Sequence, residues 1–211
     1  GNSDRILKPV RVYTKHGFPL ENNTVYVLCE VMDSEGRPHE SNMRAKLNEE
    51  EEGLWFGFEQ EYFIREEING GILGHKRNIL KGQGEYYCGV GHNVAGRDFV
   101  EDHLNMCLEY GIDITGTNAE VALGQWEYQV FGTSQKGAAD DLWMSRYILE
   151  RLGEQFGFVI NLDPKPINGD WNGSGLHTNF STDSMRTNSS MGHFMDILSK
   201  MNDRHADHIA V

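Results

Sequence analysis

The sequence predicts a layered fold that combines sheet and helix, of the mixed α/β or α+β class. Segments 24–32 and 55–64 are dominated by β-branched and aromatic residues, which is typical of strands. In 97–110 and 139–155 apolar residues recur at helical spacing, which is typical of amphipathic helices. The expected order is strand, strand, loop, helix, strand, helix, strand, helix, and elements in such an order pack as layers.

The first expected strand is TVYVLCEVM at 24–32. It contains no breaking residue, so we expect both of its faces to be covered. Asp33 and Gly36 then supply turn chemistry. Residues 69–92 are rich in glycine, which predicts a long loop that contacts a ligand or a neighbouring subunit.

Helices are expected at three places after this loop. The helix at 97–110 is followed by Gly111, a residue that readily ends a helix in the left-handed conformation. The helix at 139–155 carries Asp140 and Asp141 in its expected first turn, where carboxylates interact favourably with the helix dipole. A last helix is expected near 191–204.

Charge and composition exclude several classes of protein. The 211 residues contain 32 Asp and Glu against 19 Lys and Arg, and a net charge of −13 argues against nucleic acid as a partner. No apolar stretch approaches the roughly 20 residues of a membrane span, so no membrane partner is expected. The 3 Cys lack the spacing of a disulfide framework or a zinc knuckle, which predicts a reducing, cytoplasmic location. The length predicts one large domain, alone or with a small satellite.

Acidic side chains gather on one face of the expected strand at 55–64. Because side chains alternate along a strand, Glu59 and Glu61 share a face, about 7 Å apart. Such a pair on a largely aromatic strand destabilises the fold unless a cation compensates the charges. The alternative is a solvent-facing strand with scattered glutamates, but the flanking aromatic residues argue against exposure.

A second acidic strand is expected at 125–130. There Gln125, Glu127 and Gln129 alternate with apolar residues, so Glu127 lies on a polar face backed by an apolar one. Gly124 can turn the chain, and Glu120 on the other side of that turn can reach the same cavity.

A third polar face is expected on the strand at 176–181. It carries His177, Asn179 and Ser181 and follows a glycine-rich turn at 169–175, where backbone can approach a ligand closely. A single histidine on a strand is usually structural, but this one shares its face with two further polar groups.

The candidate metal ligands are four carboxylates and one imidazole: Glu59, Glu61, Glu120, Glu127 and His177. Such an oxygen-rich set suits Mg²⁺ or Mn²⁺ better than structural zinc. It also exceeds what one Mg²⁺ usually takes from protein, so we expect two ions. Paired hard cations are suited to phosphoryl transfer, where they neutralise phosphate oxygens.

Ordered motifs along almost the whole chain resemble one enzyme family. They are FGFEQEY at 56–62, GQGEYYCGVG at 82–91, GRD at 96–98, GIDITGTNAEV at 111–121, GQWEYQV at 124–130, DDLWMSRYILER at 140–151 and DPKPINGDWNGSGLHTNFST at 163–182. Together they closely resemble glutamine synthetase, and YYCGVG resembles its eukaryotic-type (type II) branch, which also occurs in bacteria.

The resemblance implies an ATP-dependent ligase that joins ammonia to the γ-carboxylate of L-glutamate through γ-glutamyl phosphate. It implies two or more Mg²⁺ or Mn²⁺ ions per site, with ATP as co-substrate. By motif, Glu61, Glu120 and Glu127 would hold the metal that orders glutamate and the transferred phosphoryl group. Glu59 and His177 would hold the nucleotide-side metal, with Glu127 near both.

Other roles also follow from the matched motifs. The resemblance implies ATP contacts by Trp55, Glu59, Glu127, Tyr128, Asn179 and Ser181. It implies a cradle for glutamate made by Asp170, Trp171, Asn172 and Gly173. Glu127 and Asp4 would be catalytic, and Asp4 matches an aspartate that helps order the ammonium site and the active-site flap across a subunit boundary.

The resemblance also implies a domain organisation and an assembly. Residues 1–45 would be part of a small N-terminal β-grasp domain, and 46–211 part of an α+β catalytic domain on a curved antiparallel sheet. The assembly would be a homo-oligomer with active sites between subunits, as two stacked pentameric rings.

The chain departs from the family pattern at its two ends. The W-x-F-D-G-S-S segment and everything after His208 and Ile209 are absent, including the arginines that clamp phosphates. We therefore expect these residues alone to be inactive. Two alternatives stay open: a γ-glutamyl-amine ligase that uses a larger amine, and a non-catalytic homologue with a structural or regulatory role.

Overall fold

The computed structural model describes residues 4–15, 24–47, 52–68, 70–75, 82–188 and 190–210. These residues form a small sheet of β1 (Ile6–Tyr13) and β2 (Tyr26–Met32), and a large sheet of β3 (Trp55–Glu66), β4 (Ile114–Ala119), β5 (Gln125–Gly132), β6 (Phe158–Asn161) and β7 (Leu176–Ser181). The α-helices in the described part are α1 (Arg97–Glu109), α2 (Gln135–Phe156), α3 (Asp183–Thr187), α4 (Met191–Asp203) and α5 (His205–Ile209).

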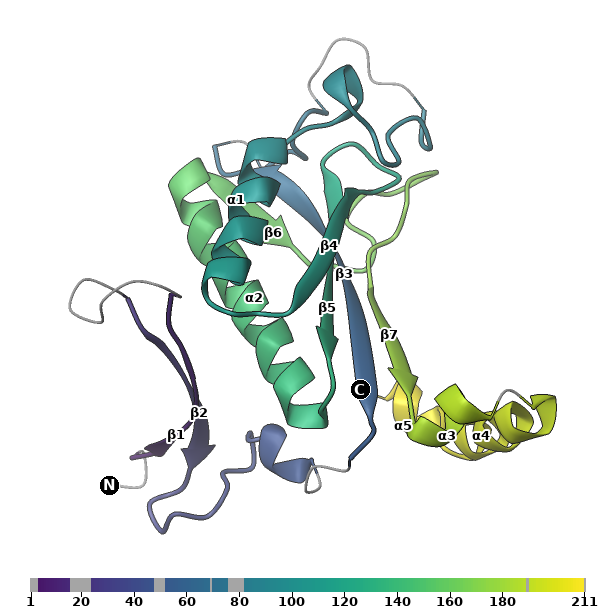
Figure 1. The fold of residues 1–211 in the computed structure, drawn as a ribbon. Helices are drawn as coiled ribbons and strands as arrows, with labels where there is room; N and C mark the ends of the chain where they lie inside the picture. Colours follow the sequence, from purple (N-terminus) through teal and green to yellow (C-terminus); the bar gives the residue numbers. More distant parts are fainter. Residues whose placement is uncertain are drawn as a thin grey trace.

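The long strand β3 organises the large sheet (Figure 1). It pairs with β5 along one edge, and β4 continues the sheet beyond β5. Along its other edge β3 pairs with β7 over its first half and with β6 over its second half. All these pairings are antiparallel, so the α+β class is confirmed.

Helices α1 and α2 cover one face of the large sheet (Figure 1). The side chains buried between helices and sheet include Tyr62, Ile64, Trp126, Tyr128, Val130, Phe99, Ile148 and Leu149. Burial of such large apolar groups is the main force that holds the two layers together. The opposite face of β3 and β5 is therefore left to the polar residues that alternate with this set.

The helix predictions are mostly confirmed, with one correction. Gly111 follows α1 with φ 73°, as expected for a residue that ends a helix. The second helix begins earlier than predicted, because the Ser134 hydroxyl accepts a hydrogen bond from the Gly137 amide at 3.1 Å and caps it there. Asp140 and Asp141 thus lie in the second turn, not the first, and both are buried.

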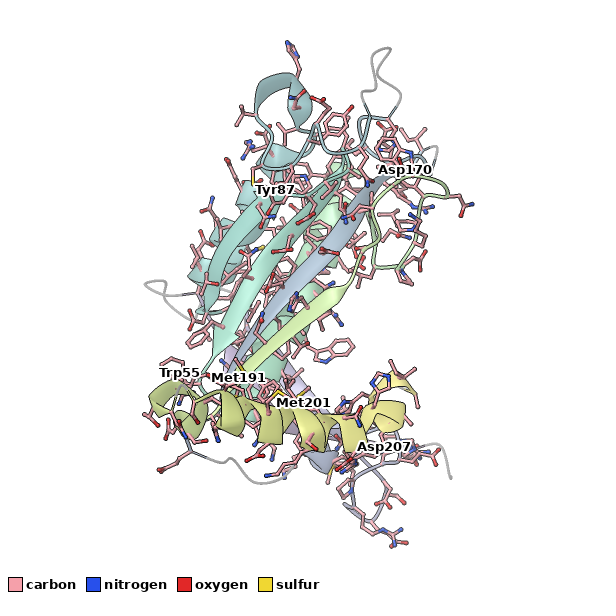
Figure 2. The ribbon with its side chains drawn as sticks, turned by 90° about the vertical axis from the view of Figure 1, so that its right-hand side faces the viewer. Trp55, Tyr87, Asp170, Met191, Met201 and Asp207 are labelled. Atoms are coloured by element: carbon pink, nitrogen blue, oxygen red, sulfur yellow. The ribbon has the colours of Figure 1, made fainter. Side chains whose placement is uncertain are left out.

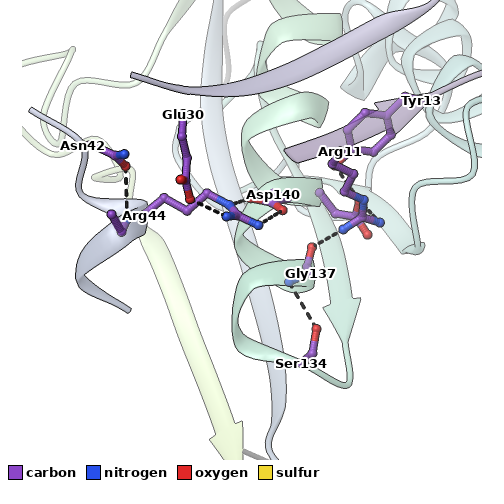
Figure 3. Close-up of polar contacts among 10 residues, drawn as sticks. Arg11, Tyr13, Glu30, Asn42, Arg44, Ser134, Gly137 and Asp140 are labelled. Carbon is purple, nitrogen blue, oxygen red and sulfur yellow. Dashed lines mark hydrogen bonds and ion pairs between the residues drawn. The ribbon is translucent and has the colours of Figure 1, made fainter. Parts of the chain in front are cut away.

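The buried Asp141 joins the small sheet to α2 (Figure 3). The Arg11 guanidinium lies 2.8 Å from the Asp141 carboxylate and donates to the Gly137 carbonyl at 2.9 Å. The Tyr13 hydroxyl donates to Asp141 at 3.0 Å. Asp141 therefore binds residues of the distant strand β1, and it does not interact with the dipole at the start of α2.

The strand prediction at 24–32 was wrong about burial. β2 pairs with β1 alone among the described strands, and Val27 on it is 47% exposed, so one face is open. The β1–β2 pair lies within the predicted domain 1–45, whose boundary at residue 45 stays a prediction. Among the described helices, none is both long and apolar enough to cross a membrane.

Candidate active site

The face of the large sheet that turns away from α1 and α2 is polar. β3 and β5 pair with Glu61 opposite Glu127, and β3 and β7 pair with Glu59 opposite His177. Because alternate residues share a face, these four side chains lie on the side opposite the apolar core. Figure 2 views this side, with Trp55 near one end of it. The strand alternation predicted from sequence therefore holds in the sheet.

Three carboxylates converge on this face. Oxygen atoms of Glu61, Glu120 and Glu127 all lie within 4.8 Å of one another, and this is the one such group of three or more potential ligands among the described residues. Glu120 and Glu127 are buried and Glu61 is half-buried. We call these three residues the carboxylate group.

A glycine turn brings Glu120 to the two strand residues. Gly124 has φ 81°, and the chain reverses there between β4 and β5. The Glu120 amide donates to the Gln125 carbonyl at 3.0 Å, and the Gln125 amide donates to the Ala122 carbonyl at 3.0 Å. The prediction that Glu120 reaches the cavity across this turn is confirmed in its geometry.

Gly124→Ala is expected to destabilise the protein by about 2 kcal/mol, through a left-handed backbone and a clash. A Cβ atom there would lie 2.6 Å from the Leu73 carbonyl oxygen. Gly36→Ala is the matched control, because Gly36 has φ 79° but a Cβ atom on it would meet nothing within 4 Å, so only about 1 kcal/mol is expected. Urea unfolding of both variants checks this, and equal losses would contradict the clash at Gly124.

Hydrogen bonds hold each member of the carboxylate group. The Gly175 amide donates to Glu61 at 2.8 Å, and the Val121 amide donates to Glu120 at 3.0 Å. The Gln129 side-chain amide donates to Glu127. Each carboxylate has two oxygens and several lone pairs, so these bonds orient the groups and leave acceptor capacity toward the shared centre.

Burial raises the pKa of all three carboxyl groups. The neighbouring Glu127 and Glu59 charges raise the pKa of Glu61 further, and the charge of Glu61 acts in the same way on Glu120. Buried or half-buried carboxylates that repel one another are what a bound divalent cation would compensate. The donor set consists of oxygen atoms, so it fits Mg²⁺ or Mn²⁺.

The metal-free protein is expected to lose stability as pH rises through these raised pKa values. Folding raises the pKa of each group above its ordinary value of 4.5, so the stabilising contribution is full below that value and is lost above the folded pKa. Urea unfolding in EDTA between about pH 4 and about pH 8 measures this.

Glu127→Gln should show a shallower loss of stability over this range. Glu101→Gln, an exposed position on α1, should keep the wild-type profile. If the stability of Glu127→Gln falls with pH as steeply as that of the wild type, the carboxylate group is not the cause of the loss.

The other two predicted metal ligands lie beside the carboxylate group and not within it. Glu59 and His177 face each other across β3 and β7, and the Asn179 side-chain amide donates to Glu59 at 2.6 Å. A pocket of about 210 Å³ adjoins Glu59 and Asn179. These residues therefore form a neighbouring polar position on the same face.

The loop predicted to cradle glutamate is attached to the second acidic strand. The buried Gln125 side chain donates to the Gly173 carbonyl at 2.8 Å and accepts from the Asn172 side chain at 3.3 Å. The centroid of the Trp171 ring lies 5.2 Å from the centroid of the His75 ring. Asp170 is exposed at the far end of this face from Trp55 (Figure 2). The loop thus borders the carboxylate group.

The structure places the residues predicted to contact ATP in different surroundings. Trp55 lies opposite Ser181, and both contact Arg186, whose guanidinium is 4.0 Å from the Trp55 ring centroid and 2.8 Å from the Ser181 hydroxyl. Tyr128 is only 1% exposed, and its hydroxyl accepts from Ser145 on α2. Its side chain points into the core, away from Glu127, which argues against the predicted role at the ATP site.

Sequence reasoning missed Arg186 and Tyr87. Arg186 lies on α3, shortly after the last recognised motif, which ends at residue 182, and no local pattern marks it. Tyr87 lies within the YYCGVG motif, and the amide of the next residue, Cys88, donates to the Ala119 carbonyl at 2.9 Å, which brings this segment beside Glu120. The Cys88 thiol and the Glu120 charge raise the pKa of Tyr87. The motif could have suggested Tyr87, since its glycine-rich surroundings predicted ligand contact.

Asp4 is not close to the carboxylate group within one chain. It precedes β1, and Figure 1 places this end of the chain beside the small sheet, with α2 between it and the polar face of the large sheet. Its predicted catalytic role would therefore depend on a neighbouring subunit.

The fold and the site define an α+β protein with a buried oxygen-donor group suited to hard cations. The family model for the glutamine synthetase catalytic domain matches residues 37–204. Glutamine synthetase 1, mitochondrial, of Drosophila melanogaster is 44% identical over 99% of this chain and 53% of its own length. The glutamine synthetases of Bradyrhizobium diazoefficiens and Xenopus laevis are each 46% identical over 100% of this chain, and over 61% and 55% of their own lengths.

The chain therefore belongs to the glutamine synthetase family. It spans between 53% and 61% of the length of these three relatives.

Proposed function

We propose that this chain carries the metal, nucleotide and glutamate positions of a ligase that joins ammonia to the γ-carboxylate of L-glutamate at the expense of ATP. The observation that supports this most directly is the carboxylate group, Glu61, Glu120 and Glu127, on a chain of the glutamine synthetase family. Bound Mg²⁺ or Mn²⁺ would neutralise phosphate oxygens as the phosphoryl group passes from ATP to glutamate.

The other candidate site residues form two groups beside the carboxylate group. Glu59 and Asn179 line the pocket of about 210 Å³, and His177 pairs with Glu59 across β3 and β7, so these three residues suit the nucleotide side. The loop 170–173 borders the carboxylate group and suits glutamate. γ-Glutamyl phosphate would form between these positions, and ammonia would then attack its γ-carbonyl carbon and displace inorganic phosphate.

A nucleotide titration tests the proposed roles. ATP is expected to bind the protein only in the presence of Mg²⁺ or Mn²⁺, and Glu59→Gln should weaken that binding at least about tenfold through loss of a charged ligand. Calorimetry measures both. Metal-independent ATP binding of equal strength in Glu59→Gln would contradict the assignment and favour a non-catalytic homologue.

These 211 residues alone are expected to form no glutamine. A coupled assay of ADP and glutamine formation measures this, and product formation would contradict it. Should product appear, a preference for larger amines over ammonia would favour a γ-glutamyl-amine ligase.

We also propose that the enzyme is cytoplasmic and assembles as two stacked pentameric rings, in which Asp4 would serve the active site of a neighbouring subunit.

A further inference from the structure

A pocket of about 450 Å³ lies where the small sheet meets α1 and α2. Its lining includes Lys15, Tyr26, Tyr110, Tyr147 and Arg151. α2 lies between this pocket and the polar face of the large sheet, so the pocket is separate from the carboxylate group. Its volume falls within the range of small-molecule sites.

Three tyrosine rings, together with Met106, form the apolar part of this pocket. The Tyr26 ring centroid lies 4.8 Å from that of Tyr110 and 5.4 Å from that of Tyr147. Burial raises the pKa of Tyr26 and of Tyr110, so both hydroxyls remain neutral. The Tyr110 hydroxyl donates to the Thr24 carbonyl at 3.2 Å, which orients its ring. Together the rings offer aromatic surface and phenolic hydroxyl groups to a planar molecule.

The charged side chains that line the pocket in the described part of the chain are both positive. Lys15 and Arg151 line it, whereas none of its described lining residues is a carboxylate, although the chain carries a net charge of −13. Lys15 pairs outside the pocket with Glu109 at 2.8 Å, and Arg151 pairs with Glu154. Both glutamates are exposed, and exposed ion pairs contribute little, so an anion in the pocket can compete with them.

We propose that this pocket binds a small aromatic molecule that carries an anionic group, a carboxylate or a phosphate. The ring lies against Tyr26 and Tyr147, and the anion pairs with Arg151 and Lys15. Arg151 is the stronger determinant, because a guanidinium binds carboxylate and phosphate through paired hydrogen bonds. The proposal is independent of the ligase function.

Calorimetric titration with four probes tests the ligand class. Indole-3-acetate supplies a ring with a carboxylate, and phenyl phosphate a ring with a phosphate. Tryptamine keeps the indole ring but carries a positive charge, and inorganic phosphate lacks a ring. At least one aromatic anion is expected to bind about tenfold more tightly than tryptamine and than inorganic phosphate. The stronger of the two aromatic anions identifies the anionic group.

Variants at the rim test the location. Arg151→Met should weaken binding of the aromatic anion about tenfold, and Glu154→Gln should strengthen it several-fold by releasing Arg151. Arg204→Met is the matched control and should change nothing, because Arg204 also pairs with an acid three residues on, Asp207 at 2.8 Å, but lies outside the pocket. Thermal unfolding verifies that each variant folds. The proposal is overturned if tryptamine binds as tightly as the aromatic anions, or if neither aromatic anion binds. It is also overturned if Arg151→Met binds the aromatic anion with unchanged affinity.

Discussion

Glu127→Gln is expected to remove most of the stabilisation that Mn²⁺ gives to this protein. Glu127 contributes one of three carboxylates whose oxygens lie within 4.8 Å of one another, and an amide carries no charge to hold the ion. A ligand that binds only the folded state at about 100 times its Kd stabilises by about 2.7 kcal/mol. For a chain of this size that raises Tm by roughly 5 to 10 °C in the wild type.

Thermal unfolding with and without Mn²⁺ measures this effect. Glu101→Gln removes a carboxylate from the exposed face of α1 and should keep the full shift in Tm. A full Mn²⁺ shift in Glu127→Gln would show that the ion binds elsewhere.

Glu59→Gln distinguishes a site that binds one Mn²⁺ ion from a site that binds two. Glu59 lies beside the carboxylate group and not within it, so its loss should leave part of the Mn²⁺ shift intact.

The carboxylate group could be predicted from sequence because its geometry is local. The two-residue period of a strand places Glu59 and Glu61 on one face whatever the rest of the fold, and the same period places Glu127 on the polar face of β5. Gly124 signals the turn that brings Glu120 back. Only the pairing of β3 with β5, which sets Glu61 opposite Glu127, needed the structure.

Tyr128 shows the limit of motif matching. The alternation of 125–130 placed Tyr128 with Trp126 on the apolar face, whereas the resemblance placed it at the ATP site. A motif transfers a position along the backbone but not the direction of a side chain. The structure agrees with the alternation, since the Tyr128 hydroxyl meets Ser145 in the core.

Long-range contacts were beyond sequence reasoning. Asp140 and Asp141 looked like first-turn residues, because nothing local shows that Ser134 caps α2 earlier. Their partners Arg44 and Arg11 lie far away in the chain, and only the tertiary fold brings them to Asp140 and Asp141. Arg186 is similar, since its contact with Trp55 depends on the pairing of β3 with β7.

Arg44→Met is expected to destabilise the protein by about 3–5 kcal/mol. The Arg44 guanidinium donates to Asp140 at 2.8 and 3.0 Å and to Glu30 at 2.6 Å, which links α2 to β2 (Figure 3). Both carboxylates are buried, so the variant leaves two charges in a poorly hydrated place without a cation. Urea unfolding at neutral pH measures the loss.

Arg37→Met is the matched control, because Arg37 also bridges two carboxylates, Asp33 at 2.8 Å and Glu35 at 3.0 Å, but does so on an exposed turn. It should cost no more than about 1 kcal/mol. Adding Glu30→Gln and Asp140→Asn to Arg44→Met should recover much of the loss, since it removes the unpaired charges. Equal effects of Arg37→Met and Arg44→Met would mean that water reaches the carboxylates of Glu30 and Asp140, and that the Arg44 contacts contribute little to holding β2 against α2.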